Sequence, residues 1–160
     1  MRSLYAYIAY RIGPGPDAED LTCDTLERAL RYRSSYDPEK GEPIAWLIGI
    51  ARHLIGTRAS GASPAGDLPG EAASGDLEAE TVERLTISAA VAELDERDRE
   101  LIALHYGADL SPRRIAELLD VRMNTIEVAL HRARERLRAR LEDGGAPELS
   151  RSDPVRGVSI

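Results

Sequence analysis

The residues best suited to bind phosphate groups are arginines concentrated in one segment near the end of the chain. Residues 111–142 hold eight arginines and five acidic residues, whereas the whole 160-residue chain has a net charge of −7. A positive segment in an acidic chain attracts polyanions to one surface while the remainder repels them. The eight arginines are Arg113, Arg114, Arg122, Arg132, Arg134, Arg136, Arg138 and Arg140.

Apolar spacing indicates how this segment folds. Ile126, Leu130, Ala133, Leu137 and Leu141 recur at steps of four, three, four and four residues, so a helix over 123–141 has one apolar face and an opposite face rich in arginine. A shorter helix over 111–119 opens with Ser-Pro and ends in a tight turn at 119–121. This order predicts a helix-turn-helix that inserts its second helix into the DNA major groove. A solvated basic helix face is the structural alternative.

The remainder of the chain supplies further helices. Helices are predicted over 80–93 and 95–106, and in the first block a helix begins near Pro16 and another near Pro43, each with proline at a first helical position. The segment after Pro43 is apolar around most of its circumference, which predicts a central helix packed between two others. Residues 1–12 form a short packing partner.

Composition divides the chain into four parts. Fourteen of the 17 residues at 59–75 are Gly, Ala, Ser or Pro, which is typical of a flexible tether. We therefore expect an all-α protein: a small helical bundle over 1–58, a flexible linker over 59–76, a second bundle over 77–142 with the helix-turn-helix, and a disordered tail over 143–160. The absence of phenylalanine predicts an aliphatic core.

Several function classes are excluded by what the sequence lacks. A single cysteine, Cys23, cannot form an intramolecular disulfide, and His53, His105 and His131 are scattered, so no metal site and no cofactor are expected. Nothing resembles a nucleophile–base pair or a phosphate loop, which predicts a protein that is not an enzyme. No stretch is apolar enough to span a membrane and no signal peptide is present, which favours a cytoplasmic protein with no membrane partner.

Both blocks resemble one family. LSPRRIAELLDVRMNTIEVALHRARERLRARL is similar to the C-terminal, promoter-reading domain of bacterial RNA polymerase sigma factors of the extracytoplasmic-function group. DAEDLTCDTLERALRYRSSYDPEKGEPIAWLIGIARHLIGTR resembles the N-terminal domain of the same group. The two matches occur in the family's order. The family usually has a further helix ahead of the one that begins near Arg2, so we expect either a truncated start or a first domain of three helices. With a truncated start, the exposed sides of Ile8 and Leu47 would lack a cover.

The resemblance implies three partners and the residues that meet two of them. In the family, the helix that begins with DAEDL, here residues 17–21, contacts core RNA polymerase, and both blocks contact promoter DNA. An anti-sigma protein is a candidate third partner. The residues at the family's core-polymerase positions are Asp20, Leu21, Asp24, Thr25, Glu27 and Arg28.

DNA contacts are implied at two promoter elements. The residues matching the part that captures the melted minus-ten strand are Tyr36, Lys40, Trp46, Arg52, His53 and Arg58. Those facing the minus-thirty-five element are Arg113, Arg114, Asn124, Thr125, Glu127, Val128, His131 and Arg132. Val128 and Ala129 offer only apolar contact to a thymine methyl, so we expect weak or unusual minus-thirty-five specificity.

Two other classes of function remain open from the sequence. One is a helix-turn-helix regulator that uses the second block alone, although nothing here resembles a dimerisation element. The other is a sigma-like adaptor that binds polymerase but no longer reads DNA, which the overall acidity and Glu127 favour. An enzyme such as a small hydrolase is a distant third.

Overall fold

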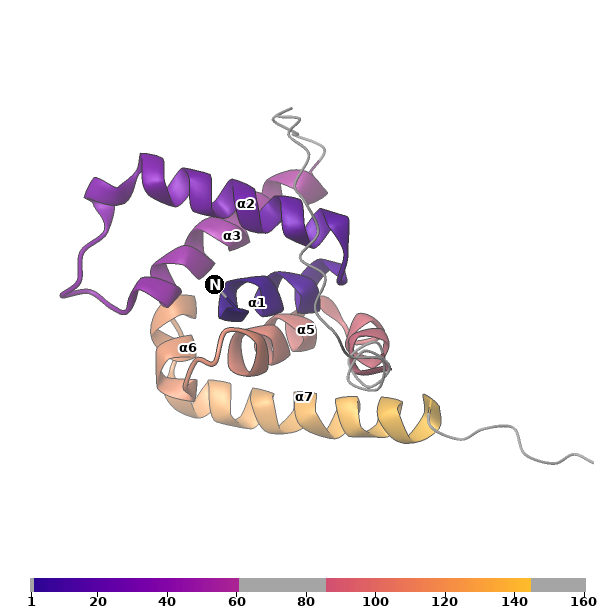
Figure 1. The fold of residues 1–160 in the computed structure, drawn as a ribbon. Helices are drawn as coiled ribbons and strands as arrows, with labels where there is room; N and C mark the ends of the chain where they lie inside the picture. Colours follow the sequence, from indigo (N-terminus) through magenta and orange to yellow (C-terminus); the bar gives the residue numbers. More distant parts are fainter. Residues whose placement is uncertain (1, 61–85, 145–160) are drawn as a thin grey trace, which may run out of the picture.

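The computed structural model describes residues 2–60 and 86–144, and every regular element in these two ranges is a helix (Figure 1). The N-terminal bundle consists of α1 (Arg2–Ile12), α2 (Pro16–Arg31), a short 3₁₀ turn η1 (Arg33–Ser35) and α3 (Pro43–Ala59). Pro16 and Pro43 occupy first-turn positions, where the missing N–H leaves no helical hydrogen bond unmade.

The C-terminal bundle spans 86–144. It contains a helix over 86–92, then α5 (Glu96–Ile102), a π-helical turn η2 (Ala103–Gly107), α6 (Pro112–Leu119) and α7 (Met123–Gly144). The predicted all-α class with a helix-turn-helix is confirmed in the described part of the chain. The expected linker at 59–76 and tail at 143–160 lie almost entirely outside the described residues.

Local side chains explain where the C-terminal helices begin and end. The Asp95 carboxylate caps α5 by accepting a hydrogen bond from the Asp98 N–H at 2.8 Å, and the Ser111 hydroxyl accepts one from the Arg114 N–H at 3.3 Å to cap α6. Asp120 ends α6 in the left-handed region at φ 53°, a conformation that aspartate tolerates better than most residues. These signals are local, which is why the helix bounds are close to those predicted.

The predicted apolar face of α7 is also confirmed. Ile126, Leu130 and Ala133 are buried, and Leu137 and Leu141 are half-buried. Ala133 joins Val91, Leu94 and Ile102 in a satellite cluster that holds the helix at 86–92 against α5 and α7.

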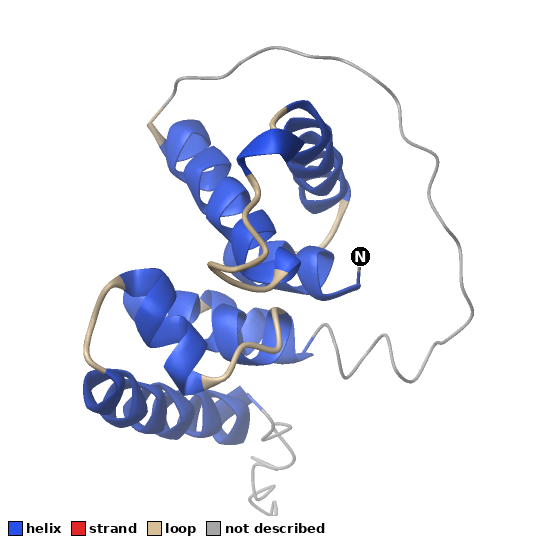
Figure 2. Ribbon diagram, turned by 90° about the vertical axis from the view of Figure 1, so that its left-hand side faces the viewer, coloured by secondary structure: helices blue, strands red, loops and turns tan. Residues whose placement is uncertain are grey.

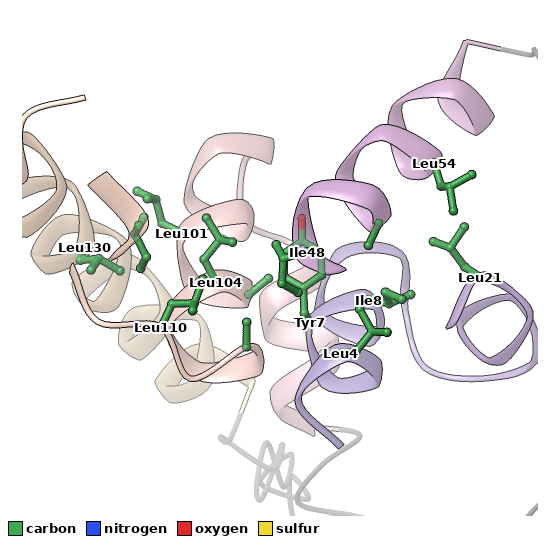
Figure 3. Packing of buried hydrophobic residues seen from close by; sticks show 14 of the residues in the cluster. Leu4, Tyr7, Ile8, Leu21, Ile48, Leu54, Leu101, Leu104, Leu110 and Leu130 are labelled. Carbon is green, nitrogen blue, oxygen red and sulfur yellow. The ribbon is translucent and has the colours of Figure 1, made fainter. Parts of the chain in front are cut away.

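The two bundles share one hydrophobic core, which the sequence did not predict. Leu4, Tyr7 and Ile8 of α1 belong to the same buried cluster as Leu104 and Leu110 of the C-terminal bundle (Figure 3). Figure 2 shows the two groups of helices stacked one above the other, with α1 at the junction (Figure 1). The expected bare surface on Ile8 is therefore absent, because Ile8 is fully buried, and Leu47 is half-buried.

The two bundles approach each other closely at Gly107, at the end of η2. A Cβ atom added to Gly107 would lie 2.8 Å from both the N and the Cα of Tyr7. Only a residue without a side chain fits there, because real Cβ atoms do not come that close to backbone atoms.

Candidate nucleic-acid interface

The first turns of α7 present most of the predicted minus-thirty-five residues to solvent. Asn124, Thr125, Glu127, His131 and Arg132 are exposed, as the sequence predicts. Val128 is 44% exposed, which is high for an apolar side chain on a helix with a buried face. A helix-turn-helix reads bases with these N-terminal residues of its second helix, so the exposed row has the right position for a DNA contact.

The two arginines predicted to hold phosphates already have a counter-ion within their own helix. Arg113 Nε lies 3.2 Å from Glu117 Oε1, and Arg114 Nη1 lies 2.8 Å from Glu117 Oε2. Hydrogen bonds from Arg114 and Arg113 lower the pKa of Glu117, so this carboxylate is fully ionised at neutral pH. A DNA phosphate must compete with it for both guanidinium groups.

A groove beside α7 brings acidic residues close to the predicted base-contact row. Asp95 and Asp98 from the start of α5 line it together with Asn124, Thr125, Val128 and Arg132. Asp98 is buried and forms an ion pair with Arg136. This pairing raises the pKa of Arg136 and neutralises one cation of the arginine face.

The six predicted minus-ten residues comprise one aromatic cluster and four separate side chains. Tyr36 and Trp46 form the cluster, with ring centroids 5.3 Å apart and planes inclined by 46°. The Tyr36 hydroxyl donates a hydrogen bond to the Gly41 carbonyl at 3.1 Å, which braces the loop between η1 and α3. Lys40 on that loop pairs with Asp37 at 3.3 Å and is 84% exposed, so its ammonium is accessible to a phosphate.

The other three residues of the minus-ten set, a histidine and two arginines, lie along α3. His53 is exposed and lines a hollow with Trp46 and Arg28. Arg58 lies 12 residues beyond Trp46, about 18 Å along the helix axis, and pairs with Asp24 at 2.8 Å. Arg52 forms an ion pair with Glu100 of the C-terminal bundle. The structure therefore does not bring Arg52 and Arg58 into the Tyr36–Trp46 cluster.

The predicted polymerase-binding residues lie on two different sides of α2. Asp20 and Glu27 are exposed, and Asp24 and Arg28 are half-buried. Leu21 and Thr25 are fully buried, with the Thr25 hydroxyl donating to the Leu21 carbonyl at 2.7 Å. These two side chains face the core from the inner side of the same helix, so the polymerase contact expected of them stays a prediction that rests on the resemblance.

Sequence reasoning missed Glu100 and Leu118. Glu100 on α5 contacts three N-terminal residues and is therefore central to the junction, whereas Leu118 on α6 lines the hollows beside Trp46. The sequence around Glu100 carries the ordinary pattern of a charged helix, so no local signal distinguishes this carboxylate from its neighbours.

Residues 2–60 and 86–144 contain neither a metal-binding cluster nor a membrane-spanning helix. No group of three or more His, Cys, Asp or Glu side chains there could hold a metal ion. None of the helices formed by these residues has the length and apolar character needed to cross a bilayer.

Comparison with known proteins matches both bundles to one class, the sigma factors. Residues 1–62 match the family described as sigma-70 region 2, and residues 84–137 match sigma-70 region 4. The chain is 29% identical to the ECF RNA polymerase sigma factor EcfG of Rhodopseudomonas palustris over 98% of this chain and 88% of that protein. It is 43% identical to the ECF RNA polymerase sigma factor BldN of Streptomyces coelicolor, but over 53 residues only, 33% of this chain and 20% of BldN.

The fold has a solved counterpart. The sigma factor RpoE of Bartonella quintana, in complex with the anti-sigma factor NepR, aligns with a TM-score of 0.66 and 24% identity over 88% of this chain and 90% of that one. The chain belongs to the sigma-70 family, in its extracytoplasmic-function group. Sigma factors are regulatory proteins that do no covalent chemistry.

Proposed function

We propose that this sigma factor binds core RNA polymerase through the exposed acidic residues of α2 and directs it to promoters through both bundles. The observation that carries the proposal is the pair of sigma-70 regions, matched in order, of which the second presents the first turns of α7 to solvent. Asp20 and Glu27, with Asp24 and Arg28 beside them, form the polymerase-facing row. A row of charges suits a charged helical partner, for which it supplies specificity and orientation.

The minus-ten strand is captured at the loop before α3. Trp46 and Tyr36 offer stacking surfaces, and Lys40 and His53 contact the backbone. Aromatic faces combined with cations are what single-stranded DNA binding requires, since stacking holds the bases while cations neutralise phosphates.

The minus-thirty-five element is read weakly. Arg113, Arg114 and Arg132 hold phosphates, while Asn124 and Glu127 reach base edges and Val128 contacts a thymine methyl. Because no arginine in the first turns of α7 is placed for bidentate contact with guanine, polymerase binding and minus-ten capture contribute most of the promoter affinity.

The remaining aspects of the proposal follow from this role. The protein is not an enzyme and acts in the cytoplasm, where polymerase and DNA are found. An anti-sigma protein is a further partner, because the similar RpoE structure was solved with one.

Permanganate footprinting of a promoter with core polymerase and the purified chain tests the proposal. Reactive thymines at the minus-ten element should appear only with both proteins present. Trp46→Ala should reduce them by about fivefold to 150-fold, since stacking contributes about 1–3 kcal/mol per base, while Trp46→Phe restores most of the signal and the control Ile12→Ala leaves it unchanged. Polymerase binding without melting would instead indicate an adaptor, and DNA binding without polymerase a regulator.

A further inference from the structure

Most arginines of the C-terminal bundle already have a partner within that bundle. Arg136 forms ion pairs with Asp95 and Asp98, and Arg140 pairs with Glu93 at 3.3 Å. The other arginines with a partner there are Arg99, Arg113, Arg114, Arg134 and Arg138. The arginine-rich face of α7 therefore offers few free cations to a phosphate backbone.

Three arginines in residues 86–144 differ from these. The side chains of Arg97, Arg122 and Arg132 are exposed and form neither an ion pair nor a hydrogen bond with any other described residue. Arg132 belongs to the predicted base-contact row of α7, and Arg122 directly precedes that helix. Arg97 lies on α5, outside the helix-turn-helix. An exposed guanidinium without a counter-ion can bind a phosphate without first losing another contact.

The packing of α5 against α7 places Arg97 beside the residues assigned to the minus-thirty-five element (Figure 1). A groove of about 540 Å³ is lined by Arg97 from α5 and by Asn124, Thr125 and Arg132 from α7. The two free arginines thus line the same groove, next to side chains that reach base edges. Phosphate contacts placed around a base-reading helix fix its register and orientation on the duplex.

The two acidic residues of this groove do not cancel its free cations. Asp98 is buried and paired with Arg136. Asp95 accepts the hydrogen bond that caps α5, and its second oxygen lies 3.6 Å from Arg136. Three arginines and two aspartates give the groove a net charge of +1, and its unpaired cations are Arg97 and Arg132. Arg136 is held in place, because leaving a buried carboxylate unpaired is strongly unfavourable.

We propose that Arg97 is a phosphate-binding residue of the minus-thirty-five interface, which contacts the DNA backbone from α5 while Arg132 contacts it from α7. This role rests on the function proposed above, because it requires the first turns of α7 to lie in the major groove. Arg97 positions α7 on the duplex, whereas Arg136 and Arg140 stabilise the bundle and contact no phosphate. The DNA-binding surface therefore extends beyond the helix-turn-helix.

The salt dependence of promoter binding tests the role of Arg97. Core polymerase assembled with the full chain is titrated with a fluorescent promoter fragment, and anisotropy gives the affinity between 50 and 200 mM salt. Arg97→Gln should make the slope of log K against log salt shallower by about 0.9, the contribution of one phosphate contact. The affinity lost across this salt range should then be about three- to fourfold smaller than for the native chain. Arg97→Lys should retain the native slope, since lysine also binds phosphate.

A matched variant separates a phosphate contact from a general effect of charge. Arg140→Gln removes the same charge from a residue that pairs with Glu93, and it should leave the slope unchanged. Urea unfolding should show native stability for Arg97→Gln, because its side chain has no partner to lose. A second fragment with a scrambled minus-thirty-five element separates phosphate from base contact, since Arg97→Gln should weaken binding to both fragments by the same factor.

The outcomes distinguish this role from the proposed function. If Arg97→Gln lowers the slope no more than Arg140→Gln does, Arg97 contacts no phosphate and the inference fails. If Arg97→Gln weakens binding only to the intact element, Arg97 reads a base and the phosphate assignment fails. In both cases the native chain still brings polymerase to the promoter, so the proposed function stands. If the native chain gives polymerase no affinity for the promoter, the proposed function fails and the role of Arg97 fails with it.

Discussion

Arg52 on α3 forms an ion pair with Glu100 on α5, with 2.8 Å between Arg52 Nε and Glu100 Oε1. The two residues are 48 positions apart and belong to different sigma-70 regions. The Glu100 carboxylate is only 13% exposed, so this pair is more shielded from water than an ordinary surface pair. A cation assigned to promoter DNA is thereby neutralised by the other half of the same chain.

A double-mutant cycle should detect this pair. Arg52→Gln and Glu100→Gln, singly and together, should give a coupling free energy for unfolding of about 0.5–1 kcal/mol, because Arg52 is partly solvated and screening reduces the attraction. Urea unfolding of each variant gives each value. The cycle of Arg58→Gln with Glu100→Gln serves as the control and should be additive, since Arg58 pairs with Asp24 instead. Additive free-energy changes in both cycles would contradict an interaction between Arg52 and Glu100.

Alkaline pH should weaken the packing of α1 against the C-terminal bundle through Tyr7. Burial, and secondarily the Glu100 charge, raise the pKa of the Tyr7 phenol well above its usual value, while Arg11 opposes the shift. A buried phenol with a raised pKa stabilises the folded chain fully below its ordinary pKa of about 10, and this stabilisation is lost as pH rises beyond it. The free energy of unfolding, measured with urea, should therefore decrease above pH 10, by up to about 1.4 kcal/mol per pH unit.

Tyr7→Phe should remove that pH dependence, and Tyr32→Phe should not, because Tyr32 is 56% exposed. An equally steep pH response in Tyr7→Phe would assign the loss of stability to another group.

Glu117→Gln should strengthen DNA binding in a salt-dependent manner. The substitution removes the counter-ion shared by Arg113 and Arg114, and both guanidiniums become free for phosphates. The slope of log K against log salt should steepen by about 1 for each additional phosphate contact. Fluorescence anisotropy with duplex DNA between 50 and 200 mM salt measures both effects. The gain in DNA affinity caused by Glu117→Gln should be constant between pH 6 and pH 8, since the lowered pKa of Glu117 keeps the native carboxylate ionised there.

Alanine substitutions at two residues of α7 should distinguish an effect on stability from an effect on DNA recognition. Leu130 is fully buried, so Leu130→Ala should lower the free energy of unfolding by about 2–5 kcal/mol. Val128, two residues earlier and 44% exposed, should change it by no more than about 0.5 kcal/mol when replaced by alanine. Urea unfolding provides the comparison. If Val128 contacts a thymine methyl, Val128→Ala should reduce discrimination between thymine and uracil at one minus-thirty-five position, and equal affinity for both bases in the native chain would exclude that contact.

The sequence by itself determined the helices, their caps and the helix-turn-helix. Asp95, Ser111 and Asp120 act on backbone groups within a few residues, and the apolar steps from Ile126 to Leu141 fix which face of α7 is buried. It also indicated which segments lie in each half of the protein, because both family patterns are contiguous in the chain. It did not indicate that Leu21 and Thr25 face the core, because a family position on an amphipathic helix does not specify which side of that helix is buried.

Only the tertiary structure decided how the two halves meet. Gly107 opposite Tyr7, and Glu100 among Tyr7, Arg11 and Arg52, are contacts between residues 48 to 100 positions apart. No helical period or capping preference extends across such separations. The glycine is required because two backbones approach closely, and the carboxylate is bound because three donors converge on it, so both depend on the shape of the packed interface.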